Sequence, residues 1–386
     1  MKHRTGWLSG LLCVLLGASP PALACTLCQG SPQTTPTLRQ GASQAKLILY
    51  GTMVSSKLTG TGGTTEMKIE RKLRNDPFLG DQNTVTVPRY IPVDPKDPPK
   101  YVLFADVFNN KLDFYQGIEV KSGTLVDYLK GALDLDAKDQ TAALRYFFRY
   151  LDASDSTVAN DAFLEFAKAN DADIGQVARH LDPQKLRKLI DDPRTPANRV
   201  GLFAFLLGAC GGDAEADFLR GMIDKPDTRT AAALDGALAG YVQLRPREGW
   251  DLVLSILKDG KRRFSERTAA LGTVRFYHGW KGKDVDREVL RCLGALLDQG
   301  DIADMAIEDL RRWKMWDLTG EVLAQYGKKS HDAPLVRRAI VRYALSCARE
   351  DSRFKEPAAR FVEAQRRQDA ELVRDVEESL QFEKMK

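Results

Sequence analysis

The feature that most constrains the fold is a repeat of about 34 residues in the second half of the chain. Each unit has a short apolar helical segment, a polar turn and a longer helical segment. The leading leucines of the five units are Leu186, Leu219, Leu254, Leu290 and Leu323, with spacings of 33, 35, 36 and 33 residues. Since one helical hairpin cannot bury its own apolar face, such units stack and share a core. The repeat therefore predicts an α-solenoid.

Two further regularities recur within the units. An arginine stands at or near the start of the second segment in four of the five, at Arg199, Arg229, Arg267 and Arg338. The turns carry Asp with Pro or Gly, which end the first helix and allow the second to begin. We interpret the arginines as hydrogen-bond and ion-pair residues between units. The pattern resembles HEAT-like helical repeats over about residues 180–350, and the resemblance implies a concave surface that binds other proteins.

Before the repeats, residues 45–122 have the alternating pattern of β-strands. Strand signals lie at 45–58, 66–73, 83–91, 101–108 and 111–120. Asn109-Asn110 between the last two predicts a two-residue hairpin turn, and the proline-rich residues 92–100 predict a loop. Five short strands with this punctuation predict a small closed or half-closed β-barrel. From about residue 123 the apolar period changes from two to 3.6, which indicates helices from there to residue 386.

The N-terminus has the pattern of an export signal. Basic residues, a short apolar run and Ala22-Leu23-Ala24 precede Cys25, so we expect residues 1–24 to be removed. No later apolar run approaches the roughly 18 residues of a membrane-spanning helix. The prediction is therefore a secreted or periplasmic protein whose mature chain begins at Cys25, with residues 25–44 as a cysteine-containing lead-in. A lipid anchor on Cys25 is the competing interpretation.

Cys25 and Cys28 form a single Cys-x-x-Cys pair. One pair supplies only two of the four ligands of a closed zinc site, and Gln29 replaces the histidine that haem attachment requires. Their predicted state is a local disulfide or two exposed thiols. The later cysteines, at positions 210, 292 and 347, lie in apolar helical patterns and are interpreted as small buried residues.

The first half also resembles the netrin-like and metalloproteinase-inhibitor domains, over about residues 25–120. The matching stretches are Cys25-Thr26-Leu27-Cys28, the strand LILYGTMVSSKL, and YVLFADVF followed by KLDFYQ. The resemblance implies an OB-type barrel. In the inhibitor members the free amine and carbonyl of the first cysteine chelate a catalytic zinc, a role that would fall to Cys25. The family has Cys-x-Cys with bridges into the barrel, whereas this chain has no cysteine between residues 29 and 209.

The sequence carries no pattern that predicts catalysis. A formal net charge of +4 is too small to indicate nucleic-acid binding, and there is no nucleophile elbow or phosphate-binding loop in a suitable context. We predict no catalytic, cofactor or metal residues. The residues predicted for partner binding are Trp280, Trp313, Trp316, Arg262 and Arg263, near the edges of the repeats.

The expected fold is thus a small five-stranded OB-like β-barrel followed by an all-α, HEAT-like solenoid. The expected function is an exported, non-enzymatic protein-binding scaffold whose protein partner the sequence does not identify. The alternative is a metalloprotease inhibitor that acts through Cys25.

Overall fold

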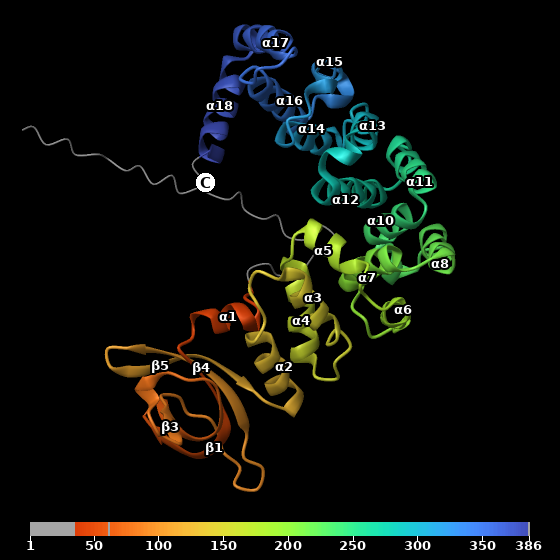
Figure 1. Cartoon of the computed structure of the whole chain (residues 1–386). Coiled ribbons are helices and arrows are strands. Elements are labelled where there is room, and N and C mark those ends of the chain that lie inside the picture. Colours follow the sequence, from red (N-terminus) through yellow and green to blue (C-terminus); the bar gives the residue numbers. More distant parts are fainter. Residues whose placement is uncertain (1–34, 61, 385–386) are drawn as a thin grey trace, which may run out of the picture.

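A computed structural model describes residues 35–60 and 62–384 of the chain. A five-stranded antiparallel sheet is followed by a long, entirely helical region (Figure 1). The predicted signal at residues 1–24 and both Cys25 and Cys28 lie outside the described residues.

The sheet has the strand order β3-β2-β1-β4-β5, and every neighbouring pair is antiparallel. Its strands are β1 Leu47–Thr59, β2 Gly62–Arg74, β3 Thr84–Val87, β4 Lys100–Phe108 and β5 Lys111–Glu119. A short 3₁₀ helix, η1 Pro77–Leu79, connects β2 to β3. The described hydrogen bonds leave the sheet open between β3 and β5, but Figure 1 shows it curling on itself. The five strands that the alternation predicted are confirmed, and they form one antiparallel sheet that is open between β3 and β5.

Alternate residues of β1 enter two different cores. Leu47 and Leu49 lie in the core that the curved sheet encloses, together with Met67 of β2 and Val85 of β3. Ile48, between them, packs instead with the buried residues of the helical region. This is why the first strand reads as a continuous apolar run, since both of its faces are covered.

The turn between β4 and β5 is the predicted hairpin. Asn109 and Asn110 have φ angles of 48° and 60°. Positive φ at both central residues is the geometry of a type I′ turn, which asparagine tolerates better than other non-glycine residues. The prediction from Asn109-Asn110 is confirmed, and residues 92–99 form the predicted loop before β4.

A short helix, α1 Leu38–Gln44, lies in the stretch that we expected to be a polar lead-in. Thr37 caps it through a reciprocal capping box with Gln40. The backbone N–H of Leu38 donates to Asp161 at 2.8 Å, and Arg39 pairs with Glu165 at 2.7 Å. A seven-residue helix is not stable alone, so these tertiary contacts with the helical region account for it.

The helical region begins with four helices whose buried residues share one core with Ile48 of β1 and Phe104 of β4. They are α2 Gly123–Leu133, α3 Gln140–Phe148, α4 Ser156–Lys168 and α5 Asp171–Ala178. Tyr128 of α2 lies fully buried at their centre and donates its hydroxyl to Asp161 at 2.6 Å. Burial raises the pKa of Asp161 to about 6, although Tyr128 and Leu38 both donate hydrogen bonds to it.

Six helical hairpins follow and form a curved array. Their helices are α6 Pro183–Asp191 with α7 Ala197–Cys210; α8 Asp213–Asp224 with α9 Thr228–Ala231 and α10 Leu234–Leu244; α11 Pro246–Lys258 with α12 Phe264–Lys281; α13 Asp286–Leu296 with α14 Ala303–Arg312; α15 Thr319–Leu323 with α16 Pro334–Cys347; and α17 Lys355–Gln368 with α18 Ala370–Lys384. Short 3₁₀ helices, η2 Gly282–Val285, η3 Trp316–Leu318 and η4 Lys329–His331, lie in the connections. The predicted helical-repeat region is confirmed, and one further hairpin extends it.

The array is an arc with two layers (Figure 1). The second helices of the hairpins, α7, α10, α12, α14, α16 and α18, lie on its inner side, and the first helices lie on its outer side. Leu186 and Leu219 are fully buried between the layers. Leu254 is also buried, whereas Leu290 and Leu323 are half-buried and the valines before them, Val289 and Val322, are fully buried. The first three units therefore bury the same position, and the next two bury the residue before it.

Candidate functional site

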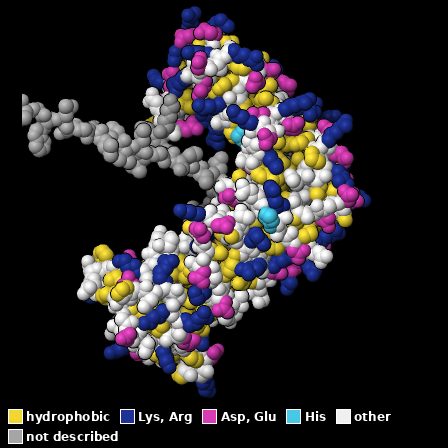
Figure 2. Space-filling view, viewed as in Figure 1, with side chains coloured by type: hydrophobic (Ala, Val, Ile, Leu, Met, Phe, Trp, Pro, Cys, Tyr) yellow, Lys and Arg dark blue, Asp and Glu magenta, His cyan; other side chains and the backbone are white. Residues whose placement is uncertain are grey.

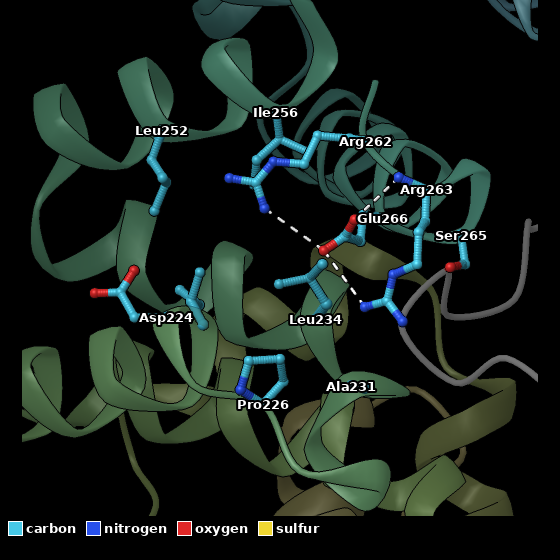
Figure 3. Close-up of a pocket in the computed structure, with 11 residues that line it drawn as sticks. Asp224, Pro226, Ala231, Leu234, Leu252, Ile256, Arg262, Arg263, Ser265 and Glu266 are labelled. Atoms are coloured by element: carbon cyan, nitrogen blue, oxygen red, sulfur yellow. Dashed lines mark hydrogen bonds and ion pairs between the residues drawn. The ribbon is translucent and has the colours of Figure 1, made fainter. Parts of the chain in front are cut away.

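The first candidate site contains the predicted residues Arg262 and Arg263 (Figure 3). They lie in the turn between α11 and α12 and line a hollow of about 140 Å³ beside the preceding hairpin. Both guanidinium groups lie 3.5 Å from Glu266, whose carboxylate also accepts the Arg263 backbone N–H at 3.0 Å. Burial alone would raise the pKa of Glu266, but the Arg263 hydrogen bonds and the two positive charges hold it below its ordinary value. One carboxylate therefore already serves both arginines.

The three predicted tryptophans pack within and between hairpins. Trp280 lies 5.5 Å from the ring of Phe205 on α7. Trp313 stacks on His278 with ring centroids 3.8 Å apart, and Trp316 is buried. None of these rings is fully exposed. All three pack against other rings, Trp316 also lines a hollow described below, and Arg262 and Arg263 are the exposed part of the predicted set.

The recurring arginines join neighbouring units, as predicted. Arg267 is almost fully buried and donates to Gln299 at 2.7 Å and to Asp301, both in the next hairpin. Arg229 donates to the backbone carbonyl of Ile190 in the preceding hairpin. Their contacts are those of residues that hold the array together.

The inner layer carries a second set of ion pairs, which we call the inner ladder. Arg275 of α12 pairs with Asp309 of α14 at 2.7 Å. Glu308 of α14 accepts from Arg311 and from Arg342 of α16, each at 2.9 Å. Burial raises the pKa of Asp309, although Arg275 opposes this shift. The ladder connects three consecutive inner helices with opposite charges in register.

The ladder leads into a larger hollow at the carboxyl ends of α14, α16 and α18. We call it the basic hollow; its volume is about 440 Å³. It is lined by Arg311, Arg312, Lys314, Trp316, Ser346, Arg349, Glu350, Leu380 and Glu383. These residues come from the inner helices and the segments that follow α14 and α16, so the hollow belongs to the inner layer of the arc.

The charges of the basic hollow do not balance. Arg311 pairs with Glu383 at 2.9 Å, and Lys314 pairs with Glu350 at 2.8 Å. The side chains of Arg312 and Arg349 are exposed and make no hydrogen bond or ion pair with any other described residue. Two guanidinium groups therefore remain available to a ligand in one hollow. Arginine is well suited to bind carboxylates because its planar donors match their geometry.

Lys314 adds a second unusual feature to the hollow. It follows α14 with a φ of 56°, in the left-handed region. The N–H of Met315 reaches back to the carbonyl of Leu310 at 2.9 Å, which closes the helix end in a pattern that usually has glycine at this position. A lysine here costs the fold about 1 kcal/mol relative to glycine, and it places an ammonium group on the rim of the hollow.

Of the residues that line the basic hollow, Trp316 alone was among those predicted for partner binding. Arg311 and Glu383 are 72 positions apart in the chain, and no local spacing indicates that they meet. The only sequence signal is the run Arg311-Arg312-Trp313-Lys314, which also reads as the ordinary basic end of a helix.

The cysteines of the described residues are free thiols. Cys292 and Cys347 are buried and Cys210 is half-buried, which agrees with their interpretation as packing residues. Burial raises the pKa of Cys292 to about 12, so this thiol is a poor nucleophile at neutral pH. Over the part of the chain that the structure describes, no three metal-ligating side chains cluster, and no helix is long and apolar enough to cross a membrane.

Lysine and arginine are interspersed with aspartate and glutamate over the surface seen in Figure 2, so this view shows no face of one sign of charge. Comparisons with protein families, with curated proteins and with solved structures find no match to this chain.

Proposed function

We propose that this chain is an exported, non-enzymatic scaffold that binds a protein partner on the inner layer of its helical arc. The observation that carries the proposal is the row of inner helices α12, α14, α16 and α18, which ends in a hollow with unpaired cations. Stacked helical hairpins use such extended inner surfaces for binding. The resemblance of the repeats to HEAT-like units supports the same role.

The sheet is the second module of the proposal. Its strand order and half-closed curl suit an OB-type domain, and this is the support for the netrin-like resemblance. Helix α1 ties it to the helical region through the Arg39–Glu165 ion pair. We propose that the sheet contributes a further contact surface, so that one partner or two are held by a single chain.

Export is the third part of the proposal, and its support is the sequence pattern before Cys25. Intact mass of the mature chain would test it directly. A start at Cys25 without added lipid supports a secreted or periplasmic protein, whereas an acyl chain on Cys25 supports an anchored one. The same mass reports whether Cys25 and Cys28 are bonded.

The binding role is tested by capture followed by mapping. The mature chain is immobilised, its partner is identified by mass spectrometry, and the purified complex is examined by hydrogen exchange. We expect protection of α12, α14 and α16 and little change in α11 and α13 of the outer layer. Protection confined to the outer helices, or the absence of any specific partner, would refute the proposal.

The alternative is inhibition of a metalloprotease through Cys25, and its support is the netrin-like resemblance alone. It predicts that one residue added before Cys25 abolishes inhibition, because the free amine would be lost. Inhibition that survives the addition would exclude it.

A further inference from the structure

We propose that the basic hollow binds an acidic segment of the protein partner, with Arg312 and Arg349 as the residues that contact its carboxylates. This inference rests on the proposed function and adds the chemistry of the ligand. Its starting point is the excess of cations over carboxylates in a hollow lined by residues of α14, α16 and α18.

The first argument is the charge balance. The lining has Arg311, Arg312, Lys314 and Arg349 against Glu350 and Glu383, an excess of two positive charges. The two glutamates are already engaged, by Lys314 and Arg311 respectively. A ligand that supplies two carboxylates would complete the set. Arg312 interacts with Asp309 and Glu383 only at a distance, so an anionic ligand that contacts the two arginines directly adds favourable Coulomb energy.

The second argument is that ion pairs hold together the helices from which Arg312 and Arg349 extend. Glu308 holds both Arg311 and Arg342, and Arg342 also donates to Ser379 of α18 at 3.2 Å. These contacts tie the three inner helices together beneath the hollow. A rigid support of this kind reduces the conformational entropy that is lost when a ligand binds.

The third argument is the apolar part of the wall. Leu380 and Trp316 line the hollow beside the arginines, and both are buried in the free protein apart from the surface that they present there. A volume of about 440 Å³ lies within the range of ligand sites in proteins. A peptide with acidic side chains and an interspersed aliphatic one fits this combination better than a small inorganic anion does.

The position of Arg311 and Arg312 at the end of α14 has a structural explanation as well. Cations in the last turn of a helix interact favourably with its dipole. That explanation does not extend to Arg349, which follows the end of α16 and lines the same hollow, nor to the left-handed lysine at position 314. Convergence of these residues from separate hairpins is the observation that favours a ligand.

The test uses the mature chain and a fluorescein-labelled peptide rich in glutamate with interspersed leucine, read by fluorescence polarisation at low ionic strength. We expect saturable binding that weakens as salt is added. The same peptide with glutamine in place of glutamate should not bind. The double variant Arg312→Gln/Arg349→Gln should weaken binding by about tenfold or more.

A matched control removes two positive charges from the smaller hollow between α11 and α12. Arg262→Gln/Arg263→Gln has the same change in net charge, so its binding should stay within about twofold of the wild type if the site is assigned correctly. Arg312 and Arg349 are exposed and make no ion pair, so their replacement should cost at most the roughly 1 kcal/mol of the helix-dipole interaction at Arg312, a fall in the unfolding temperature of about 2–4 °C or less. Circular dichroism of every variant checks that the fold is intact.

Equal losses in the two double variants would show a general charge effect and overturn the inference. It would also be overturned if the peptide failed to bind, or if only heparin or polyphosphate bound through these arginines. Should the peptide fail while a captured partner still protects the inner helices, the inference falls and the proposed function stands.

Discussion

Helices α7 and α10 pack backbone against backbone, and this contact can be tested with one methyl group. A Cβ atom added to Gly236 of α10 would lie 1.8 Å from the carbonyl oxygen of Gly201 on α7. One turn further, a Cβ on Gly240 would lie 2.5 Å from the carbonyl oxygen of Ala204. The three atoms nearest the added Cβ at position 236 all belong to the backbone of Gly201, so an alanine there requires the two helices to separate.

The sign of the effect follows from comparing two terms. Alanine in place of glycine inside a helix gains about 1 kcal/mol from backbone entropy. Forcing extra volume into a packed core costs about 1–3 kcal/mol, and more when backbone must move. Separation of the helices also weakens the contact of Gly208 with Gly240. We therefore expect Gly236→Ala to lower the free energy of unfolding by about 2 kcal/mol.

Gly221 of α8 provides the matched control, because a Cβ added there meets no atom within 4 Å. Gly221→Ala should stabilise the chain by about 0.5–1 kcal/mol. Thermal unfolding followed by circular dichroism measures both variants, and a change of about 1 kcal/mol moves the midpoint by about 2–4 °C at this size. An unfolding temperature of Gly236→Ala equal to or above that of Gly221→Ala would refute the packing argument.

Three further predictions concern buried or strained residues. Burial raises the pKa of Asp235 to about 7. The stability that its protonation provides is therefore present below about pH 4 and is lost as the pH rises through 7. Asp235→Asn should flatten this fall in the free energy of unfolding, measured with urea between pH 4 and 7, and an unchanged slope would contradict the prediction. Arg39→Ala leaves the buried Glu165 without its cation and should cost about 3 kcal/mol, seen as faster hydrogen exchange in α1. Lys314→Gly should raise the free energy of unfolding, measured in urea, by about 1 kcal/mol. Lys314→Ala keeps the left-handed backbone and loses the ion pair, so it should give no such gain.

The parts of the fold that were predictable from sequence are those that depend on near neighbours in the chain. Asn109-Asn110 specifies its turn through its own backbone preferences. The change of apolar period near residue 123 marks the start of the helical region, whose first helix, α2, begins at Gly123. The leading leucines at 186, 219 and 254 are buried, as stacking of similar units requires, whereas those at 290 and 323 are half-buried.

The parts that were missed depend on contacts between distant segments. Helix α1 exists because Asp161 and Glu165, more than 120 positions away, bind its first residues. Trp316 packs against Tyr343 and also lines the basic hollow, and its neighbours in the hollow come from segments far away in the chain.

The sequence by itself determined that this chain has a β-rich part followed by stacked helical hairpins, since periodicity and turn residues act over a few positions. Only the tertiary structure decided where arginine side chains without an ion-pair partner lie close together. Arg312 and Arg349 belong to different hairpins, and they come together because the arc brings the ends of α14 and α16 beside α18. Local preferences determine secondary structure, whereas a binding surface is a property of how the units are stacked.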